Sequence, residues 1–103
     1  KNLGHILENI IFLELKRRGY KIYIGKNDLT EVDFVVETSD ELVYIQVALS
    51  VRDEGTLERE LRPLESINDH FRKYIITLDY DTNIYNGIKQ ISAMDFLTGR
   101  VDI

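Results

Sequence analysis

The stretch that decides the fold is TEVDFVVETSDELVYIQVAL, residues 30–49. Residues 30–38 and 42–49 are rich in β-branched and aromatic side chains, and their hydrophobicity alternates as it does in strands with two different faces. The tight polar connection at residues 39–41 joins them directly. Residues 30–49 therefore predict two neighbouring strands of one sheet.

The alternation also assigns side chains to the faces of these strands. In the first strand, one face carries Val32, Phe34 and Val36, and the other carries Glu31, Asp33, Val35 and Glu37. In the second strand, one face carries Val43, Ile45, Val47 and Leu49, and the other carries Tyr44, Gln46 and Ala48. The pattern thus places Asp33 and Gln46 on the more polar side of each strand.

Upstream of these strands, the chain predicts a helix and a third strand. Apolar residues recur at helical spacing over residues 3–15, and they are Leu3, Ile6, Leu7, Ile10, Ile11 and Leu15. Basic residues 16–18 suit the negative end of a helix dipole, and Gly19 suits a left-handed stop. Residues 20–24 then predict a strand that a turn at residues 25–28 joins into a hairpin, which completes a meander of three strands.

Downstream, the pattern returns to a helix and further strands. Asp53 offers an N-cap for a helix with a stripe of Leu57, Leu61 and Leu64, which Pro63 is expected to bend or end. Residues 74–78 form an almost continuous apolar run, as in a central strand covered on both faces. Asn86-Gly87 marks a turn into a last strand at residues 88–91. A final helical turn follows, with Ser92 and Asp95 as a capping box and Gly99 at its end.

Size and composition limit the classes of protein. The 103 residues are 44% hydrophobic and 30% charged, which fits a single globular domain over residues 1–103. The longest unbroken apolar run, residues 10–13, is far shorter than the roughly 20 residues of a membrane span. The chain starts without Met and enters the first helix at once, so we expect a piece of a longer protein.

The net charge and the absence of cysteine limit the kinds of partner and site that we expect. Lys and Arg number 13 against 18 Asp and Glu, so the net charge is −5, which argues against nucleic-acid binding by bulk charge. The chain has no cysteine, which excludes disulfides and thiolate metal sites and suits a cytoplasmic protein. His5 and His70 are too few and too distant in sequence to suggest an imidazole metal site.

Three polar residues suggest a hard-cation site. Glu8 lies at the border of the apolar stripe of the first helix, while Asp33 and Gln46 occupy the two strands that follow. Oxygen ligands from a helix and from alternate strand positions are what Mg²⁺ requires. The alternative reading is structural, with Glu8 and Asp33 as surface acids and Gln46 as a buried hydrogen-bonding amide.

The chain resembles a known family in several of its motifs. They are GHILEN at residues 4–9, ELKRRGY at residues 14–20, EVDFV at residues 31–35, YIQVA at residues 44–48, RELRPL at residues 59–64 and NGI at residues 86–88. Together they look like the C-terminal DUF4143 domain of prokaryotic AAA-type ATPases, which is related to the PD-(D/E)XK nucleases. The resemblance covers nearly the whole chain and implies a restriction-endonuclease-like αβββαβ core with a mixed central sheet flanked by helices.

The resemblance also implies roles for residues. Glu8 matches the helix acid of the nuclease site, Asp33 the strand acid and Gln46 the second acid, so these would bind Mg²⁺ and catalyse phosphodiester cleavage. Ala48 stands where the family pattern has its lysine, and a neutral amide at position 46 ligates a cation more weakly than a carboxylate. Arg59 or Arg62 on the following helix would then supply positive charge to nucleic acid, unless they form an ordinary solvated face.

Two hypotheses follow. The first is a nuclease-like accessory domain of an AAA-type ATPase that binds DNA with weak or lost metal-dependent cleavage. ATP chemistry would belong to another part of that protein, because this chain contains no G-x-x-x-x-G-K-[ST] phosphate loop. The second is a catalytically inactive structural or protein-interaction module of that ATPase, which is consistent with Ala48 and the acidic balance. Fold alone does not choose between them.

Overall fold

The computed structural model describes residues 2–25 and 31–103. Its elements follow the order α1 (Leu3–Arg17), β1 (Lys21–Ile24), β2 (Phe34–Glu37), β3 (Leu42–Val47), α3 (Glu54–Glu65), β4 (Arg72–Thr77), β5 (Ile84–Tyr85), β6 (Ile88–Ser92) and α4 (Ala93–Leu97). The predicted αβββαβ order is confirmed. In the described part of the chain, no helix combines the length and hydrophobicity needed to cross a membrane.

Over the described residues the strands form one mixed sheet in the order β1-β2-β3-β4-β6-β5. The first three are antiparallel neighbours, so the predicted meander is confirmed. β3 and β4 are parallel because the crossover through α3 returns the chain to the same end of the sheet, and β4 and β6 are parallel as well. β5 closes the sheet as a short antiparallel edge strand.

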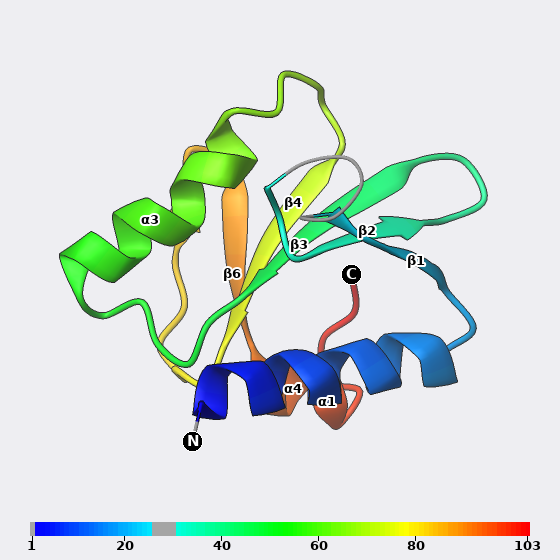
Figure 1. The fold of residues 1–103 in the computed structure, drawn as a ribbon, viewed down its shortest axis with the longest axis horizontal. Helices are drawn as coiled ribbons and strands as arrows, with labels where there is room; N and C mark the ends of the chain where they lie inside the picture. The colour runs from blue at the N-terminus through cyan, green and yellow to red at the C-terminus, as the bar shows by residue number, and fades with distance from the viewer. Residues whose placement is uncertain (1, 26–30) are drawn as a thin grey trace.

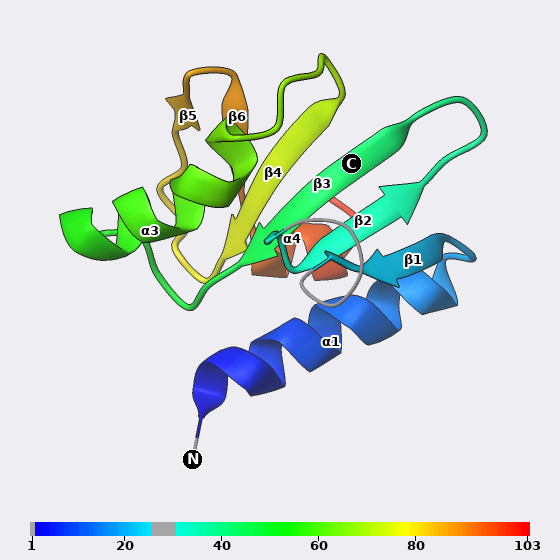
Figure 2. The same cartoon turned by 45° about the horizontal axis from the view of Figure 1, so that its top comes forward.

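Helices cover both faces of this sheet (Figures 1 and 2). On one face, Leu7 and Ile11 of α1 and Phe96 of α4 pack with Phe34 and Ile45 of the sheet. The other face lies against α3, whose buried leucines pack with Val35, Tyr44 and Ile75. β4 runs through the middle and is buried from Tyr74 to Thr77, as the apolar run predicted, whereas Leu78 at the end of that run lies outside the strand and is 48% exposed.

Helix and turn signals in the sequence are realised where they were expected. The side chains of Asp53 and Ser92 accept backbone N–H hydrogen bonds at the starts of α3 and α4, as predicted. The side chain of Asn2 caps the start of α1 in the same way. Gly19 adopts a φ of +87° directly after α1. α3 ends two residues after Pro63. The turn before the last strand has positive φ at both Asn86 and Gly87, which forms a two-residue hairpin with β5, a strand that the sequence did not predict.

The strand predicted for residues 30–38 is shorter than expected. β2 begins only at Phe34, because residues 31–33 form a bend. Val32 consequently packs with Val35 on the α3 side rather than with Phe34 and Val36. Val35 is fully buried although it was assigned to the polar face, because α3 covers that face as well. Thr30 and most of the predicted turn, residues 26–28, lie outside the described residues.

Other predictions of burial are wrong on α1 and after β3. Leu3, Ile6 and Ile10 belong to the apolar pattern of α1 but are exposed, because the sheet meets only the stripe that contains Leu7 and Ile11. Leu49 is also more than one-third exposed, since β3 ends at Val47 and the chain leaves the sheet there.

Candidate functional site

Asp33 and Gln46 lie opposite each other where the pairing of β2 with β3 ends. The register pairs Phe34 with Ile45, so Asp33 falls beside Gln46. Both residues are buried, with 5% and 3% of their surfaces exposed. The alternative interpretation of Asp33 as a surface acid is therefore wrong.

Side chains take over the hydrogen bonding at this point of the sheet. The carboxylate Oδ2 of Asp33 accepts a bond of 2.8 Å from the backbone N–H of Val47, and the N–H of Asp33 donates at 2.7 Å to Oε1 of Gln46. Because the chain bends before Phe34, regular ladder bonds end there, and these two bonds continue the connection. We call Asp33, Gln46 and Glu60 the β2–β3 brace.

Glu60 of α3 is the member of the brace that sequence reasoning missed. Nε2 of Gln46 donates to Oε1 of Glu60 at 3.0 Å and lies 3.3 Å from its backbone carbonyl oxygen. The amide of Gln46 thus joins the start of β2 to α3 through the sheet. The available signal was the spacing of Glu60, three residues after Leu57 and four before Leu64, which puts it at the sheet-facing border of α3.

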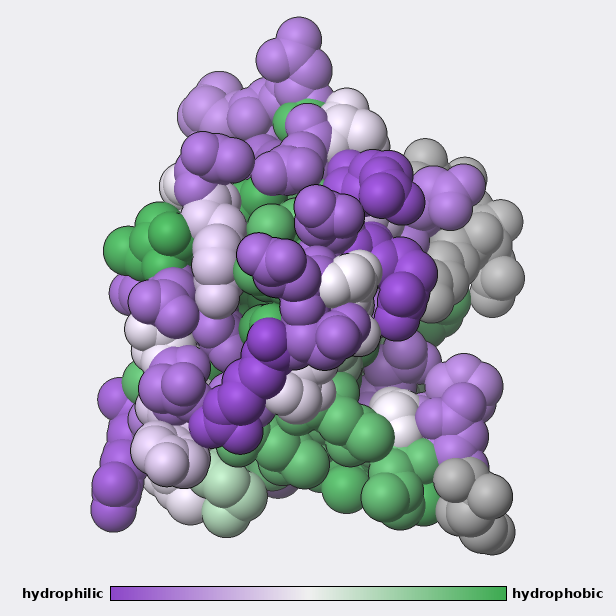
Figure 3. Space-filling view, turned by 90° about the vertical axis from the view of Figure 1, so that its left-hand side faces the viewer, coloured by the Kyte–Doolittle hydropathy of each residue, from purple (hydrophilic) through white to green (hydrophobic). Residues whose placement is uncertain are grey.

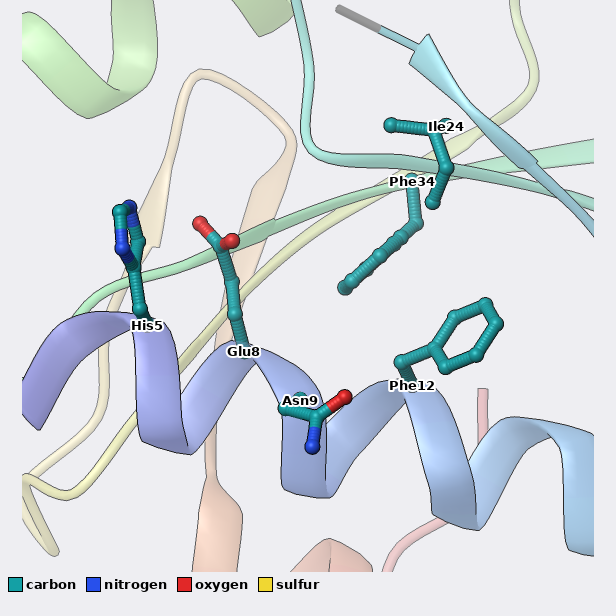
Figure 4. A pocket seen from close by; sticks show the side chains of 6 residues that line it. All are labelled: His5, Glu8, Asn9, Phe12, Ile24 and Phe34. Atoms are coloured by element: carbon teal, nitrogen blue, oxygen red, sulfur yellow. The ribbon is translucent and has the colours of Figure 1, made fainter.

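Glu8 lies on the other side of this region, on α1. It lines an open cavity of about 320 Å³ together with His5, Phe12, Ile24 and Phe34, and with Asn9 at its rim. Figure 4 shows the side chains of His5 and Glu8 rising side by side from α1, while Phe12 and Phe34 face each other at a ring distance of 5.9 Å. One side of the cavity therefore carries polar side chains and the other carries aromatic rings.

A second open cavity, of about 400 Å³, lies between the start of α1, the end of β3 and the start of α3. Its lining includes Glu8, Ala48, Arg59 and Glu60. Ala48, for which the resemblance to the nucleases implies a lysine position, presents only a methyl group here. Arg59 is exposed, and its Nη2 lies 3.5 Å from Oγ1 of Thr56. Arg62 is exposed too, but does not line this cavity.

The structure therefore brings the predicted residues together in two groups. Asp33 and Gln46 touch directly, whereas Glu8 shares a cavity with Arg59 and the unpredicted Glu60. Neither Asp33 nor Gln46 lines either of these cavities. Glu8 is linked to the brace through Glu60, which belongs to both groups.

Two of the oxygen atoms proposed as Mg²⁺ ligands already accept hydrogen bonds. Oε1 of Gln46 is neutral and already accepts from Asp33, and Oδ2 of Asp33 accepts from Val47. Among residues 2–25 and 31–103, no group of three or more His, Asp or Glu side chains is placed to hold a metal ion.

Other buried polar groups lie farther along the sheet. Asp79, 4% exposed, accepts hydrogen bonds from the N–H of Val51 and from Gln90, and its Oδ1 lies 3.2 Å from Arg52. Tyr44 donates to Asp69 at 2.8 Å, and burial, together with this acceptor, raises the pKa of Tyr44 to about 12. These groups hold loops against the sheet at sites separate from Glu8 and the brace.

Comparison with known proteins places the chain in a family. The model of "Domain of unknown function (DUF4143)" matches residues 3–96. An uncharacterized protein of Haemophilus influenzae is 40% identical over 97 residues, which cover 93% of this chain and 24% of the relative. An uncharacterized protein of Methanocaldococcus jannaschii is 32% identical over 100 residues, 92% of this chain and 22% of the relative.

The chain thus spans about a quarter of the length of these relatives. No solved structure matches it. The family model covers nearly all of the fold, from the start of α1 to Phe96 of α4. The chain belongs to the DUF4143 family.

Proposed function

We propose that this chain is a non-cleaving accessory domain of a larger cytoplasmic protein, in which it acts by binding another part of that protein. The larger protein would be an AAA-type ATPase, as the resemblance in the sequence implies. The αβββαβ order and the mixed sheet support descent from a PD-(D/E)XK nuclease. The length of the relatives supports a role within a longer polypeptide.

One observation carries this proposal: Asp33 and Gln46 are buried in hydrogen bonds that hold β2, β3 and α3 together. A catalytic pair must present oxygen atoms to a cation and to a phosphate group. Here Oδ2 of Asp33 accepts from the N–H of Val47 at 2.8 Å, and Oε1 of Gln46 accepts from the N–H of Asp33 at 2.7 Å. These bonds join β2 to β3, which supports a structural role for the pair.

Ala48 also supports a non-cleaving role. A nuclease of this class needs positive charge beside the phosphate as negative charge develops in the transition state, and such a group contributes several kcal/mol. The methyl group of Ala48 supplies none. Arg59 lines the same cavity, but the carboxylates of Glu8 and Glu60 line it as well. Side chains of both signs of charge therefore line this cavity.

A cleavage assay tests the proposal. Supercoiled plasmid is incubated with this chain and Mg²⁺ or Mn²⁺, and nicking is compared with that of the Glu8→Gln and Asp33→Asn variants. We expect no metal-dependent nicking above the level of either variant. Metal-dependent nicking that disappears in Glu8→Gln, with the fold intact by circular dichroism, would overturn the proposal.

A second candidate function is metal-dependent binding and cleavage of nucleic acid. The observation that favours it is that Glu8 and Glu60, carboxylates from two helices, line one cavity with Arg59. Calorimetric titration with Mg²⁺ separates the two functions. Binding that is lost in both Glu8→Gln and Glu60→Gln favours the nuclease, whereas no binding favours the accessory domain.

A further inference from the structure

The outer face of α1 is apolar and uncovered. It consists of Leu3, Ile6, Ile10 and Leu13, which are between 42% and 59% exposed. Exposed apolar residues that occur singly are ordinary on a protein surface, but a continuous row of four on one helix is not. Figure 3 shows hydrophobic side chains gathered along the lower edge of the molecule, at the end where α1 begins.

The spacing of these residues indicates what they fit. They follow one another at steps of three, four and three, which is the repeat of an a/d seam between two packed helices. The residues that pack on the sheet, Leu7, Ile11 and Leu15, form a separate stripe. α1 therefore carries two apolar stripes, one used within this fold and one directed away from it.

The neighbouring helix α4 also carries an exposed apolar side chain. α4 packs beside the end of α1, where the guanidinium of Arg18 lies 4.0 Å from the ring centre of Phe96 and donates to its carbonyl oxygen. Met94 of α4 is 57% exposed. Flexible Met side chains adapt well to a packed partner.

The length of the relatives indicates what covers the outer face of α1. In both relatives the matched region is about a quarter of a single polypeptide, so about three quarters of each relative is tethered to that region. A tethered segment has an effective concentration in the millimolar range, which favours it over a free second copy. In such a polypeptide, an uncovered apolar stripe therefore packs preferentially against residues of the same polypeptide.

We infer that the outer face of α1 packs against an α-helix from the part of the larger polypeptide outside the matched region. This inference rests on the proposed function, because it names the surface through which the accessory domain binds. The partner helix carries apolar residues at the same alternating steps of three and four.

Thiol labelling tests the inference, since this chain has no cysteine of its own. Ile10→Cys places a thiol on the outer face, and Lys16→Cys places a matched control on the exposed polar side of the same helix. Each is made in this chain alone and in the full-length Haemophilus influenzae relative with this chain in place of its matched region. Mass spectrometry then measures the alkylation rate of the α1 peptide.

We expect both thiols to react freely in the chain alone. In the full-length protein, the rate at Ile10→Cys should fall at least about tenfold, while that at Lys16→Cys changes little. An unchanged rate at Ile10→Cys would overturn the inference and leave the proposed function standing. Protection of Ile10→Cys in the chain alone, together with a dimer in sedimentation velocity, would overturn it in favour of a second copy.

A charged variant provides an independent measurement. Ile6→Glu/Ile10→Glu should leave the melting temperature of the chain alone nearly unchanged, because this face contacts solvent there. The same change should lower the melting temperature of the full-length protein, and Ile84→Glu on exposed β5 should not. Equal melting temperatures for all full-length variants would contradict the inference. Metal-dependent nicking would instead contradict the proposed function, so the two failures are distinguishable.

Discussion

The carboxylate of Asp33 shows how the surroundings of one residue decide its role. Opposite the backbone N–H of Val47, with 5% of its surface exposed, it replaces a ladder hydrogen bond that the bend before β2 removes. A buried N–H without an acceptor costs more than an exposed one, because water cannot replace the lost partner.

We predict that Asp33→Ala lowers the free energy of unfolding by about 1–3 kcal/mol, because it leaves the buried N–H of Val47 without its acceptor. Asp33→Asn should cost less, since its amide oxygen still accepts. Urea denaturation measures both, and Asp40→Ala on the exposed β2–β3 connection is the control. Equal stabilities of Asp33→Ala and Asp40→Ala would show that the brace contributes nothing.

Glu14 is a second residue whose charge matters. Hydrogen bonds from Arg17 and from Arg18 lower its pKa from 4.5 to about 2. A lowered carboxyl pKa stabilises the fold above pH 4.5, and this contribution disappears as the pH falls towards 2. We predict that the melting temperatures of wild type and Glu14→Gln differ most above pH 4.5 and converge near pH 2. A difference that is constant over this range would contradict the assignment.

At the scale of elements, turns and crossovers determine the order of the strands. The hairpin of β5 and β6 depends on Asn86 and Gly87, both with positive φ, and it places a short strand at the edge of the sheet. No atom lies within 4 Å of the position a Cβ would take on Gly87, so backbone strain alone decides what a larger residue costs there.

We predict that Gly87→Ala destabilises the chain by roughly 1–2 kcal/mol, because its φ of +84° is unfavourable for residues with a Cβ. Asn86→Gly should change stability by no more than about 0.5 kcal/mol, since glycine tolerates this conformation. Thermal denaturation compares the two. A neutral Gly87→Ala would mean that the hairpin reorganises without cost.

At the scale of the whole molecule, charge separates the two proposed functions. With a net charge of −5, the chain repels a phosphate backbone, and Arg59 and Arg62 are the cations that would have to overcome this. The affinity of a domain for a nucleic acid falls steeply as the salt concentration rises, because binding to phosphates releases counterions. The affinity for a protein partner does not have this steep dependence.

We predict no measurable binding of a short DNA duplex by fluorescence anisotropy at roughly 200 mM salt, and at most weak binding at roughly 50 mM. Arg59→Ala/Arg62→Ala should leave this result unchanged. Tight binding with a steep salt dependence that the double variant abolishes would contradict the non-cleaving interaction role and support the nuclease reading.

The sequence by itself determined the αβββαβ order, the caps at Asp53 and Ser92, the stop at Gly19 and the central strand around Tyr74. These depend on local periodicity and backbone preference, which a single sequence carries. It also indicated the pair Asp33 and Gln46, although as metal ligands rather than as hydrogen-bond partners of each other.

Only the tertiary structure decided what these residues contact. Periodicity along a chain does not say how far a strand pairs or which of two apolar stripes meets the sheet, because both depend on partners distant in sequence. The end of the β2 ladder at Phe34 turned Asp33 inward, the crossover brought Glu60 to Gln46, and the position of α1 left Ile6 and Ile10 uncovered. Packing between elements, which is not encoded locally, gave these side chains their roles.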